Sequence, residues 1–423
     1  MAVVDKLMIN DFIKKGDLND MPQIIYNLKK DLYKCTSVKT NKWYQFLNNH
    51  WIRLNASQII SVIINEFYEE YVHYITQCSE RMFTENCQYE REILNINLLD
   101  TKMKIKKIKK PSFNKYLLSS CSHLLYDDSF EKKLDTDPYL IGFENGVYDL
   151  SKKQFRRGVL NDFISQSTGY DYPSDTTQTD TNQTQLTDII KQTELFLKEI
   201  LDDDIRDYVL SNIAAYLEGI VRKELIMILI GNDWKKNRLI ELIIATFGDY
   251  FDVLPIQHNT DSEQLYKKHK KRFILIKSQQ PTLHTDSMLD LVNGGVIVAN
   301  IYSDTIMYKP QFKILYTFNT ITTVDEPNPG LYRRLRIINQ SNQSNDVPIS
   351  TLIDELITND PNELIALRQG FVWLLINKYY PMYVNCEITE TPSRIVQQCR
   401  DLQYRSLQSK DLQYTDLQFK DLQ

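Results

Sequence analysis

Glycine is scarce in this sequence, with 12 residues among 423. Loops that bind phosphate use glycine, because the missing side chain lets backbone N–H groups wrap around the anion. The low glycine count therefore disfavours the commonest forms of nucleotide-binding site.

Cysteine and histidine are also few, with six residues of each. No two cysteines form a C-x-x-C pair and the histidines are scattered, so neither a zinc site nor any other metal site is expected. Sparse cysteines in a long chain indicate reduced thiols in a cytosol-like compartment. The cysteines are Cys35, Cys78, Cys87, Cys121, Cys386 and Cys399.

No stretch approaches 18 consecutive apolar residues, so we expect no transmembrane helix. Residues 1–7 lack the charged segment and apolar core of a signal peptide, so we do not expect secretion. The 50 Lys+Arg and 55 Asp+Glu residues give a net charge of −5. The molecule has no overall basic field, and any contact with nucleic acid must come from local patches.

Hydrophobic residues make up 42% of the chain, which is typical of a folded protein, and the length predicts two or three domains. Residues 1–172 predict a mainly helical domain that ends in a small β region. Within it, 41–50 and 51–75 carry apolar residues at helical spacing. The lysines of 102–110 could lie on a helix facing either phosphate or solvent, and solvent is favoured.

Residues 139–150 predict a β-hairpin. Its turn falls at Glu144, Asn145 and Gly146, and Asn-Gly favours a type I′ turn because both central positions need positive φ. The following tract, 173–188, is rich in Thr, Gln, Asp and Ser and has few apolar residues. It predicts a flexible linker and a domain boundary.

Residues 189–345 predict an α/β core. Continuous apolar runs separated by helical segments indicate a largely parallel sheet that is buried on both faces. The predicted strands are 225–230, 273–276 and 312–318, and the predicted helices are 189–220 and 239–247.

The chain then continues as a helical segment over 346–400. From residue 401 to residue 423 a Leu-Gln pair recurs every five residues. A five-residue period is compatible with a pentapeptide-repeat coil or with a flexible tail. Too few repeats are present to bury a solenoid core, so the tail is favoured.

The strand and helix at 225–247 have the layout of a P-loop, which needs the pattern G-x-x-x-x-G-K-[ST]. Only Gly231 fits that pattern. Lys236 stands where the second glycine belongs, Asn237 where the lysine belongs, and Arg238 where the metal-binding hydroxyl belongs.

Several short motifs nevertheless occur together in one order, and jointly they resemble the superfamily 3 helicase core of the poxvirus-type primase–helicases of large DNA viruses. The resemblance covers about residues 40–395. The motifs are Gly142-Phe-Glu-Asn-Gly-Val-Tyr-Asp-Leu150, Phe155-Arg-Arg-Gly158, Asp162-Phe-Ile-Ser165, Thr168-Gly-Tyr-Asp-Tyr172, Phe247-Gly-Asp-Tyr250, Asn293-Gly-Gly295, Lys309-Pro-Gln-Phe-Lys313, Phe318-Asn319 and Gly330-Leu-Tyr-Arg-Arg-Leu-Arg-Ile337.

The resemblance implies an AAA+-type P-loop core in a ring that moves along single-stranded DNA during replication, in the host cytoplasm or a viral replication compartment. It implies ATP and Mg²⁺ as cofactors. The implied roles are Gly231, Lys235 and Lys236 in the nucleotide loop, Asn319 as a sensor of attacking water, Arg333 or Arg334 as an arginine finger, and Lys309 and Lys313 facing DNA.

Three departures from the family pattern bear on catalysis, and one is that the family's Gly-Gly-Asp reads Gly294-Gly295-Val296 here. The P-loop lysine and hydroxyl are replaced, and the strand 273–276 runs into Lys277-Ser-Gln-Gln-Pro281 with no carboxylate before Asp286. Such losses cost orders of magnitude in phosphoryl transfer. The sequence favours a pseudoenzyme: a non-catalytic ring subunit, homo- or hetero-oligomeric, or a DNA-binding partner. An active helicase with a divergent P-loop and a decaying paralogue without a role remain the alternatives.

Overall fold

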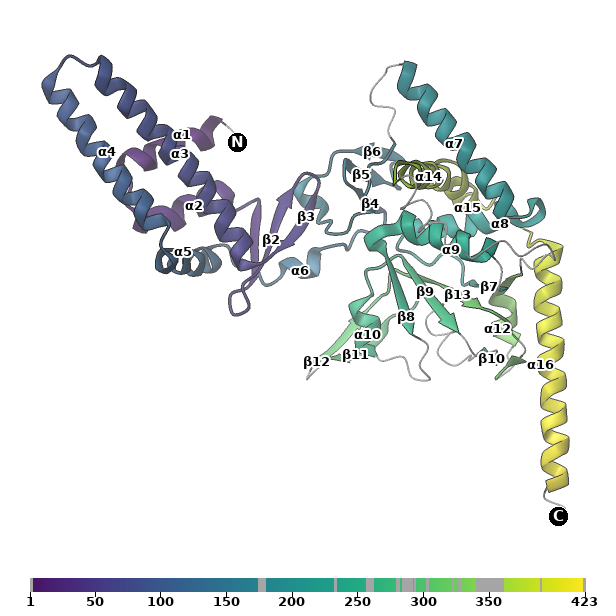
Figure 1. Ribbon diagram of the computed structural model, residues 1–423. Coiled ribbons are helices and arrows are strands. Elements are labelled where there is room, and N and C mark those ends of the chain that lie inside the picture. The colour runs from purple at the N-terminus through teal and green to yellow at the C-terminus, as the bar shows by residue number, and fades with distance from the viewer. Residues whose placement is uncertain are drawn as a thin grey trace. The chain divides into compact units, whose positions relative to one another are not determined.

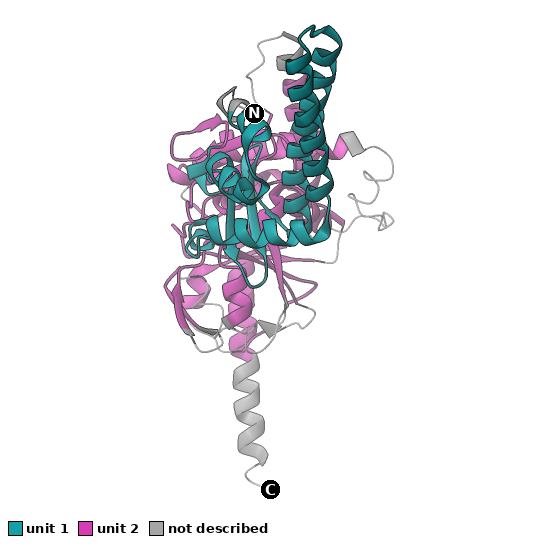
Figure 2. Ribbon diagram, turned by 90° about the vertical axis from the view of Figure 1, so that its left-hand side faces the viewer, with its two compact units in different colours: residues 1–134, 159–165 teal, residues 135–158, 166–423 magenta. Residues whose placement is uncertain are grey.

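The structure is a computed structural model. It describes residues 3–173, 180–231, 234–255, 262–278, 282–283, 292, 294–301, 304–321, 323–325, 329–339, 361–388 and 390–420. Two compact units make up the chain: residues 1–134 with 159–165, and residues 135–158 with 166–423 (Figure 2). Within the described ranges, no helix is both long and apolar enough to cross a bilayer.

Unit 1 combines a helical core with a three-stranded antiparallel sheet. Its longest helix begins with a capping box, in which the Asn55 side chain accepts from the Gln58 backbone and the Gln58 side chain accepts from the Asn55 backbone, both at 2.9 Å. The elements are α1 (Val3–Lys15), α2 (Met21–Lys29), β1 (Tyr33–Ser37), β2 (Lys42–Leu47), β3 (His50–Leu54), α3 (Ala56–Thr84), α4 (Gln88–Ile108), α5 (Pro111–Leu124) and α6 (Phe130–Lys133).

The helix predicted over residues 41–50 is wrong, because β2 and β3 form a hairpin there. Asn48 has φ of 59° in the turn, a conformation that asparagine tolerates better than most residues. The aromatic side chains explain the strand: Trp43 and Trp51 are buried, and the Trp51 ring meets the Phe130 ring edge-on at 4.7 Å. Aromatic residues favour a half-buried pleated surface over an exposed helix face.

The hairpin predicted over 139–150 is confirmed, as β4 (Leu140–Phe143) and β5 (Gly146–Asp149), with β6 (Gln154–Arg156) as a third strand. The type I′ turn is wrong, since neither Asn145 nor Gly146 has positive φ. Instead, the Asn145 side chain exchanges two hydrogen bonds with the Tyr172 backbone. Gly146 is required for packing, because a Cβ there would lie 2.5 Å from the Arg156 carbonyl oxygen.

A parallel sheet of five strands organises unit 2, as predicted (Figure 1). Its order is β15-β7-β13-β9-β8, so in chain order the strands read 5-1-4-3-2. The strands are β7 (Ile226–Ile230), β8 (Phe251–Pro255), β9 (Phe273–Ser278), β13 (Lys313–Phe318) and β15 (Leu335–Asn339). The apolar runs noted in the sequence thus form the three central strands β7, β13 and β9.

Both faces of this sheet are buried. In β7, Met227 and Leu229 face one cluster of apolar side chains, while Ile226 and Ile228 face the other. Such alternation with apolar residues on both sides is what a continuous apolar strand requires. The remaining elements are α7 (Asp180–Ile200), α8 (Asp203–Ala214), α9 (Trp234–Phe247), α10 (Ser262–Lys267), β10 (Thr282–Leu283), β11 (Ile297–Ile301), β12 (Asp304–Tyr308), β14 (Thr323–Val324), α12 (Pro329–Arg334), α14 (Pro361–Leu374), a π-helical turn (Leu375–Tyr379), α15 (Tyr380–Val384) and α16 (Ser393–Lys420).

The predicted boundary at 173–188 does not coincide with the division between the compact units, which lies at 134/135. The β4–β6 region belongs to unit 2 because Phe143 and Tyr148 pack in the same apolar cluster as the central sheet. The predicted linker also ends early, since α7 begins at Asp180; residues 174–179 lie outside the described part of the chain.

The flexible tail predicted from residue 401 is wrong over its described part, because α16 continues through it to Lys420. Leu402 is buried in the apolar cluster on one face of the sheet, and the Ser406 hydroxyl accepts from the Val324 backbone at 3.1 Å. Five residues turn a helix by about 140° beyond a full revolution, so the repeated leucines cannot share a face. Accordingly Leu402 is 1% exposed and Leu407 is 48% exposed.

Candidate nucleotide site

The carboxyl edge of the central sheet gathers most of the residues predicted to bind nucleotide. Phe318 of β13 lies opposite Ile230 of β7 on one side and Ser278 of β9 on the other. Gly231, Asn319 and the segment after β9 therefore leave the sheet at one edge. In parallel α/β sheets, ligands bind outside the carboxyl ends of the strands.

Lys236 occupies the place of the second P-loop glycine, and it is 4% exposed. Its ammonium donates to the Phe318 carbonyl oxygen at 3.1 Å, and the Gly231 backbone N–H donates to the same oxygen at 3.3 Å. Gly231 has φ of 130°, a conformation that favours glycine. Gly231 and Lys236 are thus both hydrogen-bonded to the end of the neighbouring strand β13.

The other cations of the loop are also engaged within the chain. Lys235 lies 3.8 Å from an Asp202 carboxylate oxygen. The Arg238 guanidinium lies over the Trp234 ring, 5.0 Å from its centroid. Asn237 is exposed, and residues 232–233 lie outside the described part of the chain.

The strand that should carry the metal-binding carboxylates does not supply them. The two residues after the apolar run of β9 are Lys277 and Ser278, at the positions where acidic residues would hold Mg²⁺. Asp286 and Asn293 lie outside the described residues. Among the residues that the structure describes, no group of three or more His, Cys, Asp or Glu could hold a metal ion. These side chains do not fit Mg²⁺–ATP.

The two candidate arginine fingers lie at the opposite, amino edge of the sheet. They end α12, directly before β15, whose first residue pairs with the first residue of β7. Arg334 is bound to Glu224, with 2.9 Å between its Nε and the carboxylate, whereas Arg333 is exposed. Within one chain, therefore, these arginines are not brought together with Gly231 and Asn319.

Of the two lysines predicted to face DNA, only Lys309 is exposed. Lys313 is the first residue of β13, and its ammonium donates to the Glu218 carbonyl oxygen at 2.8 Å. Burial lowers the pKa of Lys313 to about 7, against the opposing effect of the Glu218 carboxylate and with further lowering by Arg272 and Arg222.

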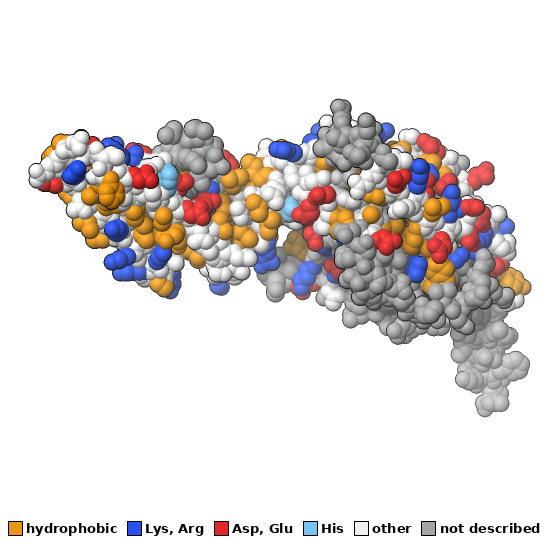
Figure 3. Space-filling view, turned by 45° about the horizontal axis from the view of Figure 1, so that its top comes forward, with side chains coloured by type: hydrophobic (Ala, Val, Ile, Leu, Met, Phe, Trp, Pro, Cys, Tyr) orange, Lys and Arg blue, Asp and Glu red, His pale blue; other side chains and the backbone are white. Residues whose placement is uncertain are grey.

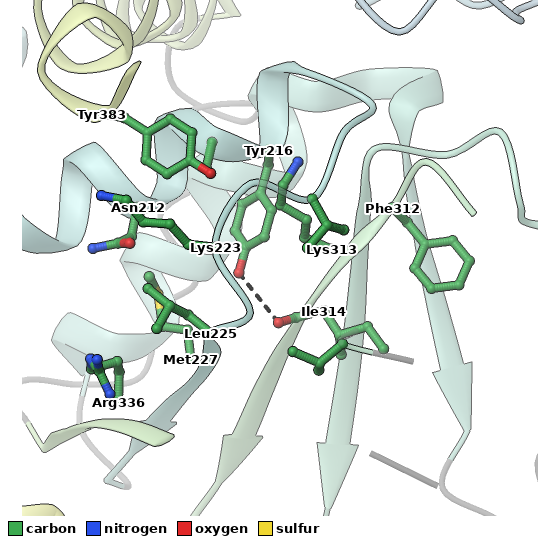
Figure 4. Close-up of a pocket in the computed structure, with 13 residues that line it drawn as sticks. Asn212, Tyr216, Lys223, Leu225, Met227, Phe312, Lys313, Ile314, Arg336 and Tyr383 are labelled. Atoms are coloured by element: carbon green, nitrogen blue, oxygen red, sulfur yellow. Dashed lines mark hydrogen bonds between the residues drawn. The ribbon is translucent and has the colours of Figure 1, made fainter. Parts of the chain in front are cut away.

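Lys313 lines a pocket at the amino edge of the sheet that sequence patterns did not indicate (Figure 4). Tyr216 donates to the Ile314 carbonyl oxygen at 3.3 Å in its wall, and Lys223 lies over the Tyr383 ring, 5.0 Å from its centroid. The lining comes from α8 and from the first residues of β7, β13 and β15. No signal in the sequence could have found it, since it depends on strand register.

The lowered pKa of Lys313 predicts a pH-dependent stability. Its ordinary pKa is 10.5, so between pH 7 and pH 10.5 the unfolded chain binds more protons at this lysine than the folded chain does. Stability should therefore rise with pH across that window, by up to about 1.4 kcal/mol per pH unit. Above pH 7, the free energy of unfolding from urea denaturation should rise with pH more steeply for wild type than for Lys313→Met. The control is Lys267→Met, which replaces an exposed lysine. Equal slopes would contradict the prediction.

Comparison with known proteins finds similarity to putative helicases and primases of viruses. Residues 23–203 match the family model described as "D5 N terminal like". The chain is 29% identical over 350 residues to "Putative helicase L207/L206" of Acanthamoeba polyphaga mimivirus, covering 79% of this chain and 36% of that protein. It is 22% identical over 315 residues to "Putative primase C962R" of African swine fever virus (isolate Tick/Malawi/Lil 20-1/1983), covering 70% and 31%.

Among solved structures, the A form apo C-terminal region of NrS-1 aligns with 90% of this chain and 75% of its own chain. The TM-score is 0.42 and the sequence identity is 11%.

The fold and site define a mixed α/β protein with a parallel five-stranded sheet, in which the Lys236 ammonium binds the carbonyl oxygen of Phe318 at the end of β13. The D5 N-terminal-like region and the viral relatives confirm the resemblance at family level: the chain is related to the poxvirus-type primase–helicases of large DNA viruses. It spans about a third of the length of the two curated relatives named above.

Proposed function

We propose that this chain is a helicase-like protein of viral DNA replication, with a superfamily 3-type core that does not hydrolyse ATP. The observation that carries the proposal is Lys236. It stands where a glycine should expose backbone N–H groups to phosphate, and its ammonium is bound instead to the Phe318 carbonyl oxygen. A buried lysine bound to the scaffold occupies a position that phosphate binding requires to be open.

The end of β9 supports the same proposal independently. Phosphoryl transfer depends on metal-bound oxygens and on a group that orients water, and these act as a unit with the P-loop. Lys277 and Ser278 offer one cation and one hydroxyl in place of two carboxylates. Restoring the P-loop residues alone would therefore leave the carboxylates missing, and restoring the carboxylates alone would leave the P-loop residues missing.

The proposed role is that of a non-catalytic subunit. In a ring with a catalytically complete relative, Arg333 is the arginine able to reach a neighbour's nucleotide, because Arg334 is held by Glu224. Single-stranded DNA is the proposed ligand. Lys309 is an exposed cation available to its phosphates.

Calorimetric titration of the full chain with ATP and Mg²⁺ tests the proposal, alongside steady-state hydrolysis with and without single-stranded DNA. We expect no saturable binding up to about 1 mM nucleotide, which is the upper end of ordinary enzyme affinities, and no hydrolysis above background. The matched variant carries Lys236→Gly, Asn237→Lys, Arg238→Ser, Lys277→Asp and Ser278→Glu, which rebuilds both elements and serves as the control for detection.

Saturable binding by the wild-type chain, abolished by Lys236→Ala, would overturn the proposal. It would establish the alternative, an active helicase with a divergent P-loop. Hydrolysis by the wild-type chain at more than about 0.1 per second, within reach of ordinary enzyme turnover, would overturn it equally.

A further inference from the structure

The helix α4 of unit 1 carries a stripe of large apolar side chains that face solvent. Tyr89 is 71% exposed, Ile96 64% and Met103 63%, and Ile93 and Leu99 are also exposed. Hydrophobic side chains gather on the surface of the α3–α4 hairpin, at the left of Figure 3, with Lys and Arg side chains beside them. Contiguous apolar surface of this kind marks an interaction site more often than isolated apolar residues do.

This stripe is separate from the face by which α4 joins its own unit. The buried face consists of Leu94, Leu98, Thr101 and Ile108, which follow one another at intervals of four, three and seven residues. At 100° per residue, the exposed apolar side chains project from the opposite side of the helix. An ordinary surface helix has one apolar stripe, so the second stripe of α4 has no use within unit 1.

The spacing of the exposed stripe is that of a coiled-coil seam. Tyr89, Ile93, Ile96, Asp100 and Met103 follow one another at intervals of four, three, four and three residues. This alternation is the a/d pattern of a heptad repeat. The one polar member, Asp100, is neutralised by Lys104 at 2.8 Å. A single polar residue in a seam fixes the register of the paired helices.

Charge divides α4 into two halves. Its first turns carry Glu90 and Glu92, whereas Lys104, Lys106 and Lys107 lie in its last turns. Two copies of α4 packed in parallel would place like charges side by side. In an antiparallel pair, each acidic half would meet a basic half. The two helix dipoles would point in opposite directions, which is favourable.

We propose that α4 pairs with α4 of a second copy of this chain as an antiparallel, two-fold symmetric coiled coil. The heptad spacing allows several registers, and charge selects the one that also places Ile96 against Asp100 of the other copy. Ile93 packs against Met103 of the other copy. The two-fold axis therefore crosses the helix pair at the level of Leu98. In that register Glu92 lies near Lys106 and Glu90 near Lys104 of the other copy, so each flanking pair is oppositely charged. The inference is independent of whether the chain hydrolyses ATP.

Sedimentation of the full chain over about 1–100 μM tests the pairing, because a single seam of about two heptads gives a weak interface. We expect concentration-dependent association that Ile96→Lys weakens at least tenfold. The matched control is Asn95→Lys, which adds the same charge to an exposed position off the stripe and should leave association unchanged. Below the concentration at which the chain associates, circular dichroism should show equal thermal midpoints for both variants, since neither position is buried within the chain.

A charge exchange tests the antiparallel direction. Glu92→Lys and Lys106→Glu should each weaken association about threefold or more, and the double variant should restore it to within about twofold of wild type. Three outcomes would overturn the proposal: a monomer at all concentrations, association indifferent to Ile96→Lys, or single charge variants that weaken association without restoration in the double variant. A fourth outcome would also overturn it: a lower thermal midpoint for Ile96→Lys alone, measured below the concentration at which the chain associates, would show that the stripe packs within its own chain.

Discussion

Replacing Arg272 with alanine is expected to lower the free energy of unfolding of unit 2 by about 3–5 kcal/mol, the range for removing one member of a buried charged network. Arg272 is 3% exposed. Its Nη2 donates to the Asp137 carbonyl oxygen at 2.9 Å and to the Leu140 carbonyl oxygen at 3.3 Å, and its Nη1 donates to the Gln311 side chain. Its removal would leave the buried Leu140 carbonyl oxygen and the two part-buried acceptors of Asp137 and Gln311 without their donor.

The position of Arg272 explains why the effect should be large. It connects the segment before β4 with the sheet strand β9 and with the connection that leads into β13. Burial lowers the pKa of Arg272, and the nearby carboxylates of Asp135, Asp137 and Glu218 oppose that shift. Gly219 leaves room for the guanidinium, since a Cβ there would overlap its Nη1.

Urea denaturation, monitored by hydrogen exchange at the backbone amides of β9 and β13, would measure the loss of unfolding free energy. Arg272→Lys should recover only part of the stability, because an ammonium cannot span the three acceptors that the guanidinium fork reaches. The control is Lys267→Ala, which breaks an exposed ion pair with Glu263 and should cost less than about 1 kcal/mol. A loss below about 1 kcal/mol for Arg272→Ala would contradict the assigned role.

Replacing Lys236 with methionine is expected to cost about 1–3 kcal/mol of stability while leaving nucleotide binding as low as in the wild type. Methionine keeps most of the buried aliphatic stem but removes the donor to the Phe318 carbonyl oxygen. A lysine that bound phosphate would show the reverse pattern: its loss would abolish binding with little change in stability.

The neighbouring lysine supplies the control. Lys235 is three-quarters buried but makes only a long ion pair, 3.8 Å, with Asp202. Lys235→Met should change the free energy of unfolding by less than about 1 kcal/mol. Thermal or urea unfolding of both variants, paired with calorimetric ATP titration, separates the two roles. Equal stabilities for the two variants would refute the structural role of Lys236.

The strands of the central sheet could be predicted because their signal is local. Ile226–Ile230, Phe273–Ile276 and Lys313–Phe318 are apolar at every or nearly every position, and only a strand buried on both faces uses such a run. The departures from the P-loop pattern after β7 and from an acidic end of β9 were also visible, since residue types at fixed offsets from those strands can be read from the sequence.

Other elements could not be predicted because their cause lies far away in the sequence. The segment 41–50 has apolar residues at helical spacing, yet it forms β2 because Trp43 and Tyr44 pack against other parts of unit 1. The repeat after residue 401 has no helical period, yet it is helical because Leu402 and Ser406 pack against β14 and β15. Tertiary burial outweighs weak local preference in both segments.

The sequence by itself determined the class of the core, the family resemblance and which residue types stand where the family pattern has its phosphate-binding and magnesium-binding residues. These depend on residue types in chain order, which no packing can alter. The tertiary structure alone decided what the substitutes do. Strand register brings Phe318 beside Ile230, and so gives Lys236 a carbonyl to bind. It also carries Lys313 into a pocket and separates Arg333 from Gly231, because residues distant in sequence become neighbours only when the sheet forms.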